Sequence, residues 1–269
     1  MTMIMMMDAM MLILALYFCL AVPSSGWAMK LPPHAKESHS MSGSSIRRRE
    51  VLASAFGIST AVLLNGDFVS YAFDNKISSK YDDRPKRRGP KPKDLGLQIR
   101  KNIEGEDYVG LKQCMGNGAP NCFVSDLSQE DDPDHYIPAW VWPEELGSDK
   151  ARAFGQLAEV LGAYPPGQSG VDGGGFKIIN NDPVKGYIYV QFESMKNGYI
   201  DDVELAFIEG KGRERSVQVR SSSRIGYLDF GVNAKRLNFL AKNLRSKGWD
   251  AQGVDLGKHQ NYAIQNELM

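Results

Sequence analysis

The stretch that decides the fold covers residues 187–222 and reads YIYVQFESMKNGYIDDVELAFIEGKGRERSVQVRSS. It contains three runs, at 187–192, 199–208 and 216–222, in which apolar and polar residues alternate. Alternation with a period of two places every second side chain on the same face, as in half-buried antiparallel strands. Glycine-containing segments between the runs supply the turns. The stretch therefore predicts an antiparallel meander with one apolar and one polar face.

Helical patterns stand on either side of these strands. Apolar residues recur at helical spacing over 149–161, and Ser148 is the expected N-cap. A second helix is predicted over 233–247, where Gly248 ends it. With a further strand near 176–179, the order is helix, four strands, helix. This order predicts an α+β fold, in which an antiparallel sheet of about four strands packs against two helices in two layers.

The beginning of the chain has the composition of a signal peptide, predicted over 1–28. Residues 10–22 form an apolar run of 13, too short to span a bilayer and typical of a signal-peptide core. Small residues follow this run, as a cleavage site requires. An uncleaved membrane anchor is the alternative.

Two further targeting segments follow the first. Residues 29–46 are Ser-rich and basic, which suits an organelle transit segment. Arg47 and its two arginine neighbours precede a second apolar run, so 47–72 resembles a twin-arginine signal. The alternative is that these arginines flank a single signal anchor. Export signals in series predict a plastid protein of the thylakoid lumen whose mature chain starts near Phe73.

The remaining chain divides by charge. Residues 73–101 contain 10 Lys and Arg against 4 Asp and Glu, with several prolines. This composition is typical of an extended, mobile arm. Residues 102–269 carry 17 basic and 24 acidic residues and are predicted to form a single α+β domain. A basic arm on an acidic body could contact an acidic complex or an anionic lipid surface, and a solvated linker is the alternative.

Composition also excludes several classes of partner and of functional site. The whole chain balances 32 Lys and Arg against 32 Asp and Glu, which argues against a nucleic-acid partner. Three cysteines cannot form a four-thiolate metal site, and no phosphate-binding or dinucleotide fingerprint is present. Beyond residue 72 only His135 and His259 remain, too few for a three-histidine zinc site. We therefore expect no catalytic residues, no metal and no cofactor.

Two cysteines remain in the expected mature chain. Cys114 and Cys122 are spaced for a short closed loop, in which glycines and a proline allow the bend. In an oxidising lumen a disulfide is predicted, and closing so short a loop should contribute roughly 2–3 kcal/mol. A thiol–disulfide switch and two free thiols remain open as alternatives.

A charged patch is predicted on the polar face of the meander. If the last turn centres near residue 212, Glu204 faces Arg220 and Asp202 faces Ser222. Arg224 shares their face, and we expect Asn233 to cap the following helix within reach of the two arginines. The patch is either a site for a polar or anionic ligand or, as we favour, a cross-strand ion-pair network that fixes register.

Several motifs together resemble the domain of unknown function 1499 family over about residues 113–249. The motifs are Pro120-Asn-Cys122, Asp201-Asp-Val-Glu204, Arg220-Ser-Ser-Ser-Arg224 and Asp229-Phe-Gly-Val-Asn233-Ala-Lys-Arg236. The stretches at 164–168, 171–176 and 191–194 are similar to its plant and algal plastid members. The resemblance implies a plastid protein and carries no established activity.

Two functions follow as expectations. The leading one is a non-enzymatic thylakoid lumen protein that binds a photosynthetic membrane complex, as accessory subunit or assembly factor, helped by an aromatic loop at Trp140 and Trp142. The other is a small-molecule or anion-binding protein, or an enzyme, that uses Asp202, Glu204, Arg220 and Arg224. A concave pocket around those four side chains would favour the second function, and a flat paired ladder the first.

Overall fold

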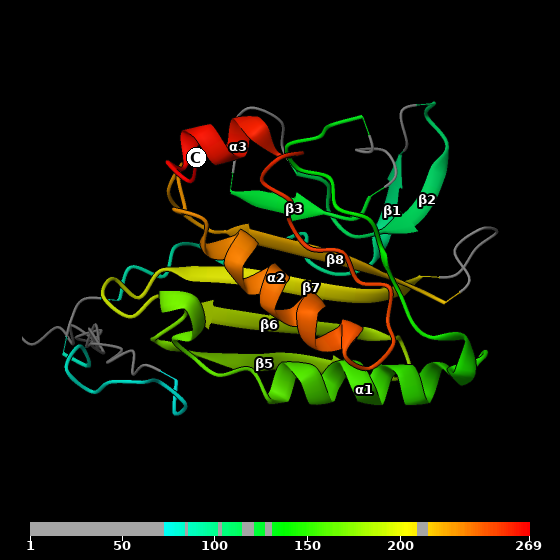
Figure 1. Cartoon of the computed structure of the whole chain (residues 1–269), viewed down its shortest axis with the longest axis horizontal. Helices are drawn as coiled ribbons and strands as arrows, with labels where there is room; N and C mark the ends of the chain where they lie inside the picture. The colour runs from blue at the N-terminus through cyan, green and yellow to red at the C-terminus, as the bar shows by residue number, and fades with distance from the viewer. Residues whose placement is uncertain (1–72, 84–85, 102–103, 115–120, 127–130, 209–214) are drawn as a thin grey trace, which may run out of the picture. The chain divides into compact units, whose positions relative to one another are not determined.

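An antiparallel sheet is the centre of the structure, a computed structural model that describes residues 73–83, 86–101, 104–114, 121–126, 131–208 and 215–269 (Figure 1). The three predicted targeting segments at 1–28, 29–46 and 47–72 lie outside these residues. The sheet consists of β3 (Cys122–Val124), β4 (Trp140–Val141), β5 (Gly175–Asp182), β6 (Tyr187–Glu193), β7 (Ile200–Ile208) and β8 (Ser216–Ser223). The strand order is β3-β8-β7-β6-β5, and β4 also pairs with β8.

The alternating runs of the sequence correspond to β6, β7 and β8, and the strand expected near 176–179 is part of β5. These four strands and the α+β class are confirmed. The predicted number of strands was too small, because β3 and β4 add to the free edge of β8. Strands of three and two residues are too short to show a period of two, so alternation could not reveal them.

Helices α1 (Lys150–Gly162) and α2 (Val232–Arg245) cover one face of the sheet (Figure 1). Both were predicted, but both begin differently. The N-cap of α1 is Asp149, whose carboxylate accepts from the Arg152 N–H at 3.0 Å. The N-cap of α2 is Gly231 at φ 78°, so the prediction that Asn233 caps this helix was wrong.

Three shorter helical segments complete the described structure. They are the 3-10 turns η3 (Glu144–Leu146) and η4 (Gln168–Gly170) and the helix α3 (Gln260–Gln265). The sequence analysis predicted no helix where α3 forms. In the described part of the chain, no helix is both long and apolar enough to cross a bilayer.

The main core lies between the sheet and these helices. The apolar side chains of β6, β7 and β8 that were predicted to share one face, among them Val190, Leu205 and Val219, are fully buried there. Leu237 and Leu244 of α2 pack against them. The periodicities of two and 3.6 therefore meet in one core, as the sequence indicated.

The face of the sheet opposite α1 and α2, which we call the open face, is covered by other segments of the chain. All nine residues of β7 are buried, so the prediction of half-buried strands was wrong for this strand. The cover comes from residues 86–97, called the strap below, and from the hairpin of β1 (Gln98–Lys101) and β2 (Asp107–Gly110). Leu95 and Leu97 of the strap pack against a small cluster of buried side chains that includes Tyr187 and Tyr189.

Candidate functional site

The register of β7 and β8 brings the predicted patch together. Asp202 lies opposite Ser222, and Glu204 lies opposite Arg220, as parity predicted. Asp202 and Glu204 of β7 are almost fully buried on the open face, where a carboxylate needs compensating donors. The question is then whether these groups face one another or face a ligand.

Asp202 is compensated by one arginine and one tyrosine. Arg224 donates to its two oxygens from Nε and Nη2, at 2.8 Å each. The phenol of Tyr189 donates to Asp202 at 2.5 Å. Burial raises the pKa of Tyr189, and the hydrogen bond to Asp202 raises it further, so the phenol keeps its proton. This pair is an internal ion pair with a bidentate guanidinium.

Glu204 is compensated from three elements. Its Oε1 accepts from the backbone N–H of Gly96 in the strap at 2.6 Å and from the phenol of Tyr187 at 2.7 Å. Its Oε2 lies 3.4 Å from Nη1 of Arg220, a longer contact. Burial raises the pKa of Tyr187, and the neighbouring Glu204 raises it further. Because both carboxylates accept from phenols and guanidiniums, neither is placed to act as a general base.

A third carboxylate on this face fastens the strap. Glu193 is fully buried, and its two oxygens accept from Lys86 at 3.3 Å and Arg88 at 2.9 Å. From its composition, the segment 73–101 was predicted to be a mobile arm. The contacts of Lys86 and Arg88 instead hold the described part of this segment on the sheet. Counts of proline and charge could not reveal this, because the buried partners lie far along the chain.

Arg220 is the least satisfied member of the patch. Its Nε and the neighbouring Nε2 of Gln218 are buried and lack a hydrogen-bond partner among the described residues. The two side chains lie two residues apart on β8 and so share the open face. We call the ion pairs formed by Asp202, Glu204, Arg220 and Arg224 the ladder. Arg220 contributes less to the ladder than Arg224 does.

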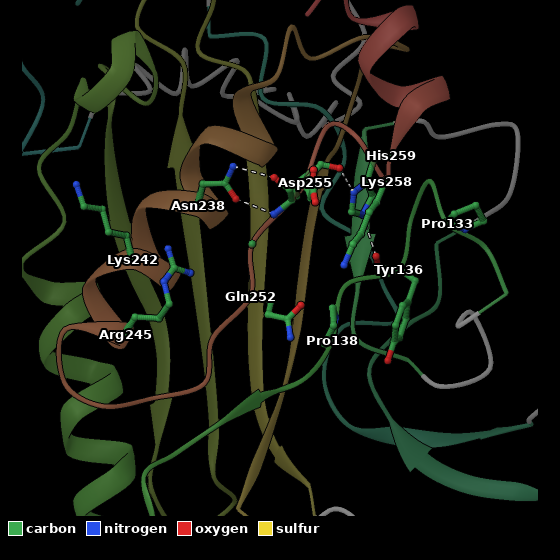
Figure 2. A pocket seen from close by; sticks show the side chains of 12 residues that line it. Pro133, Tyr136, Pro138, Asn238, Lys242, Arg245, Gln252, Asp255, Lys258 and His259 are labelled. Carbon is green, nitrogen blue, oxygen red and sulfur yellow. Dashed lines mark hydrogen bonds between the residues drawn. The ribbon is translucent and has the colours of Figure 1, made fainter. Parts of the chain in front are cut away.

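Two cavities lie outside the ladder. One, of about 460 Å³, lies on the open face and is lined by Lys91, Lys185, Tyr187 and Tyr189, among others, but by none of the four charged ladder residues. The other, of about 690 Å³, lies beside α2 and the segment 252–259 (Figure 2). Neither of these two cavities is lined by the four charged residues of the patch.

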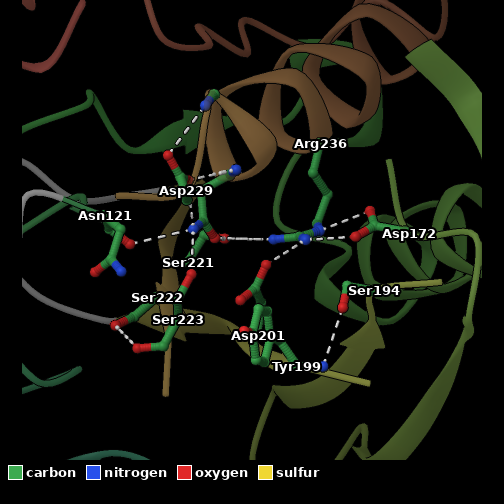
Figure 3. A network of polar contacts seen from close by, with 12 residues as sticks. Asn121, Asp172, Ser194, Tyr199, Asp201, Ser221, Ser222, Ser223, Asp229 and Arg236 are labelled. Atoms are coloured by element: carbon green, nitrogen blue, oxygen red, sulfur yellow. Dashed lines mark hydrogen bonds and ion pairs between the residues drawn. The ribbon is translucent and has the colours of Figure 1, made fainter. Parts of the chain in front are cut away.

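Asn233, the sixth predicted site residue, lies on the other face of the sheet. Its amide nitrogen donates to Ser223 at 3.0 Å and Asp229 at 2.8 Å, and its carbonyl accepts from Ser221. Ser221 and Ser223 point to the helix side, whereas Ser222 lies between them on the open face (Figure 3). The backbone N–H groups of Gly231 and Asn233 donate to Asp229, so this carboxylate occupies the helix start. The predicted joint site of helix N-terminus and arginines is therefore not formed.

Arg236 is the centre of the network on the helix side (Figure 3). Its guanidinium is fully buried and uses all five of its N–H donors. Nε and Nη2 donate to Asp172, Nη2 also donates to Asp201 at 2.7 Å, and Nη1 donates to Asn233 and Ser221.

The ionisation of this network follows from its burial. Burial alone would lower the pKa of Arg236, but Asp172 and Asp201 raise it well above its usual value. Burial raises the pKa of Asp201. Tyr164, whose phenol donates to Asp172 at 2.5 Å, also has its pKa raised by burial. One cation thus holds two carboxylates between the helix layer and the sheet.

Sequence reasoning did not single out Arg236 or Asp172 as partners. Both stand in the motifs that carried the family resemblance, at 229–236 and 171–176, so the motifs were the available signal. Their separation of 64 residues shows why spacing could not pair them.

The histidines and the aromatic loop have structural roles. His135 lies 2.8 Å from a carboxylate oxygen of Asp132, and His259 lies within hydrogen-bond distance of two backbone carbonyls. Trp140 and Trp142, the aromatic loop named in support of the leading function, are buried in the main core. Trp140 belongs to β4 rather than to a loop, and its side chain faces the helices' side of the sheet.

Cys114 and Cys122 form a disulfide, with Cα atoms 5.7 Å apart. The predicted pairing is confirmed. The bridge ties β3 to the chain that follows the β1–β2 hairpin. Among the described residues, no group of three or more His, Cys, Asp or Glu side chains is arranged to hold a metal ion.

The structure is an α+β domain. The buried carboxylates of its two charged clusters accept hydrogen bonds from side chains and backbone groups of the same domain. Residues 111–244 match the model of a protein family described as "Protein of unknown function (DUF1499)". The chain thus carries a DUF1499 domain, which contains the six-stranded sheet, α1 and nearly all of α2. The resemblance of the motifs is confirmed at this level. No curated protein and no solved structure gives a significant match to the chain.

Proposed function

We propose that this protein is a non-enzymatic binding protein of the thylakoid lumen, which docks on a photosynthetic membrane complex as accessory subunit or assembly factor. The observation that carries the proposal is the closed ladder of the open face. Asp202 and Glu204 are saturated by Arg224, two phenols and the strap, and the cavity on this face is not lined by them. This arrangement supports a binding surface over a reactive site.

The proposed compartment rests on the sequence and on one covalent bond. The serial signals predicted in the first 72 residues would suit a plastid protein exported into the lumen. The Cys114–Cys122 disulfide supports an oxidising compartment, because such bonds are rare where thiols are kept reduced.

The docking surface that we propose is the outer side of the strap and the adjoining edge of the sheet. The sheet carboxylates Glu193 and Glu204 are fully buried, whereas Lys91, Lys93 and Lys177 are exposed. The strap's own carboxylate, Asp94, is partly exposed and is paired with Lys112 at 2.7 Å. Charge is therefore segregated by depth, and the surface presented to a partner is basic. Such a surface attracts an acidic partner and steers its approach.

The test is native electrophoresis of thylakoid membranes combined with mass spectrometry. The full-length precursor is expressed in the source organism as wild type, as Lys91→Glu/Lys93→Glu, and as the matched control Arg152→Glu/Lys235→Glu on the helix side. The wild type and the control should migrate with a large membrane complex, and the strap variant should run free. The N-terminal sequence of the recovered protein should begin near Phe73.

A wild-type protein that runs free of every large complex, or is found outside plastids, would overturn the proposal. If the strap variant instead loses binding to anionic vesicles while no complex is found, the basic surface serves a lipid membrane and the partner proposed here is wrong.

A further inference from the structure

The cavity of about 690 Å³ is built by three separate parts of the chain (Figure 2). One side is a face of α2, the second is the segment 252–259, and the third is the segment 133–138. Its volume lies within the range of small-molecule sites in proteins. It is on the helix side of the molecule and shares no residue with the ladder of the open face.

The charge of the lining is positive. Lys242 and Arg245 come from successive turns of α2, and Lys258 comes from the segment before α3. Asp255 is the one carboxylate among the residues that line this cavity, and its Oδ1 accepts the Gly257 N–H at 2.9 Å. Three cations against one engaged carboxylate leave an excess of two positive charges. No described hydrogen bond or ion pair involves the ammonium of Lys242 or Lys258.

The walls are held in place by hydrogen bonds that do not involve the lysines. The side chain of Asn238 binds both backbone groups of Val254, accepting at 2.7 Å and donating at 3.0 Å. The two ring nitrogens of His259 lie 2.7 and 2.9 Å from the carbonyl oxygens of Asp255 and Tyr136. Because these bonds join all three parts, the cavity exists before any ligand arrives, which reduces the entropy cost of binding.

The third wall is apolar. Pro133, Tyr136 and Pro138 line it, opposite the cations of α2. The cavity is also too large for a bare inorganic anion. A ligand that fits must combine a multiply charged anionic group with an apolar or aromatic body.

We propose that this cavity binds an organic phosphomonoester, with the phosphate on Lys242, Arg245 and Lys258 and the organic part against Tyr136 and the prolines. A dianionic group matches the excess of two positive charges. Arginine and lysine are the usual partners of phosphate oxygens in proteins. The proposal is independent of the function proposed for the open face.

The probe is phenyl phosphate, titrated calorimetrically into the full-length protein beside inorganic phosphate and phenol. Phenyl phosphate should bind at least about fivefold more tightly than inorganic phosphate, and phenol should not bind measurably, because the charged group supplies most of the attraction. Binding should weaken as salt is added.

Two double variants test the location. Lys242→Gln/Lys258→Gln should weaken phenyl phosphate binding by about tenfold or more, because two of the three cations are gone. Lys235→Gln/Lys247→Gln removes the same charge from outside the cavity and should leave the affinity unchanged. Thermal unfolding verifies that both variants fold. No binding at millimolar phenyl phosphate, equal loss in both variants, or phenol binding as tightly as phenyl phosphate would each overturn the proposal.

Vesicles distinguish the source of the phosphomonoester. If phosphatidic acid in phosphatidylcholine vesicles recruits the protein, and phenyl phosphate competes, the ligand is a lipid headgroup. If phenyl phosphate binds and these vesicles do not, the ligand is a soluble organic phosphate. Either result supports the site.

Discussion

Two charged clusters lie on opposite faces of the same sheet, and they are closed in different ways. On the helix side, one guanidinium, Arg236, holds two carboxylates and uses all of its own donors. On the open face, three carboxylates are shared among two arginines of the sheet and two basic side chains of the strap. The first cluster is sealed by helices that the core already holds, whereas the second depends on the strap at residues 86–97.

The difference shows how the same residue types can be structural in two senses. A buried network with no spare donor fails when any one member is lost, because the remaining charges stay buried. The ladder of the open face is also buried, but each of its carboxylates accepts from several partners, so the loss of one arginine leaves the other donors in place. Removal of single members should therefore separate the two clusters clearly.

The largest effect is expected for Arg236→Ala. This substitution leaves Asp172 and Asp201 buried without their cation, so the free energy of unfolding should fall by about 3–5 kcal/mol. Urea denaturation measures the change, and Arg152→Ala on the surface of α1 is the control. A loss below about 1 kcal/mol would show that the network is not the fixed contact that its geometry indicates.

The second-largest loss of stability is expected when the Cys114–Cys122 disulfide, on the open-face side of the sheet, is removed. Replacing both Cys114 and Cys122 by serine opens a loop with a sequence separation of 8, which should cost roughly 2–3 kcal/mol on the chain-entropy model. Reduction of the wild-type protein should lower its melting temperature to that of the variant. Equal melting temperatures before and after reduction would mean that the disulfide adds nothing to the ladder's side of the sheet.

The two arginines of the ladder should differ from each other. Arg224→Ala removes two bonds of 2.8 Å to Asp202 and should destabilise by about 2 kcal/mol. Arg220→Ala removes one contact of 3.4 Å and a partly unsatisfied guanidinium, so about 1 kcal/mol is expected. Thermal unfolding of both variants at one pH measures the order. The reverse order would contradict the distances.

The two clusters should behave alike at alkaline pH. Burial raises the pKa of Tyr164 and Tyr262 on the helix side and of Tyr187 and Tyr189 on the open face. A raised pKa in the folded state gives stability that is complete below the unfolded value near 10 and is lost above it. Each tyrosine should then lower the free energy of unfolding by about 1 kcal/mol between pH 10 and 11, and by about 1.4 kcal/mol per pH unit above that.

The alkaline effect is measured as the slope of the unfolding free energy between pH 10 and 11. Tyr164→Phe and Tyr187→Phe should each reduce the loss over this interval by about 1 kcal/mol, one variant for each face. If only the helix-side variant changes the slope, the strap does not exclude water from the ladder.

Much of the fold could be predicted because the main strands and helices are long enough to show a period. β6, β7, β8, α1 and α2 all bury an apolar face, and that face is visible in the sequence. The short strands β3 and β4 and the helix α3 have too few residues for a pattern, and they form because the edge of β8 and the core hold them. These three elements are therefore formed by tertiary contacts, which a local sequence pattern does not reveal.

The candidate site was predicted only in part, because some of its contacts are local in the sequence and others are not. Parity placed Glu204 opposite Arg220 correctly, because register within one hairpin is local information. Asn233 was assigned to the wrong face, because capping propensity says nothing about whether Ser221 or Ser222 faces the helix. Arg236 escaped notice because its two carboxylates lie 35 and 64 residues away in the sequence.

The strap also has a consequence for the order of folding. Lys86, Arg88 and Gly96 are synthesised early, but their partners Glu193 and Glu204 follow 105 to 108 residues later. Contacts of such sequence separation close large loops and form late, after the hairpins of β6, β7 and β8 have nucleated. A chain whose translation has stopped short of residue 193 therefore has a dangling basic segment and nothing to hold it. The strap can dock only once Glu193 of β6 and Glu204 of β7 have been synthesised, so this early segment waits for strands that come more than a hundred residues later.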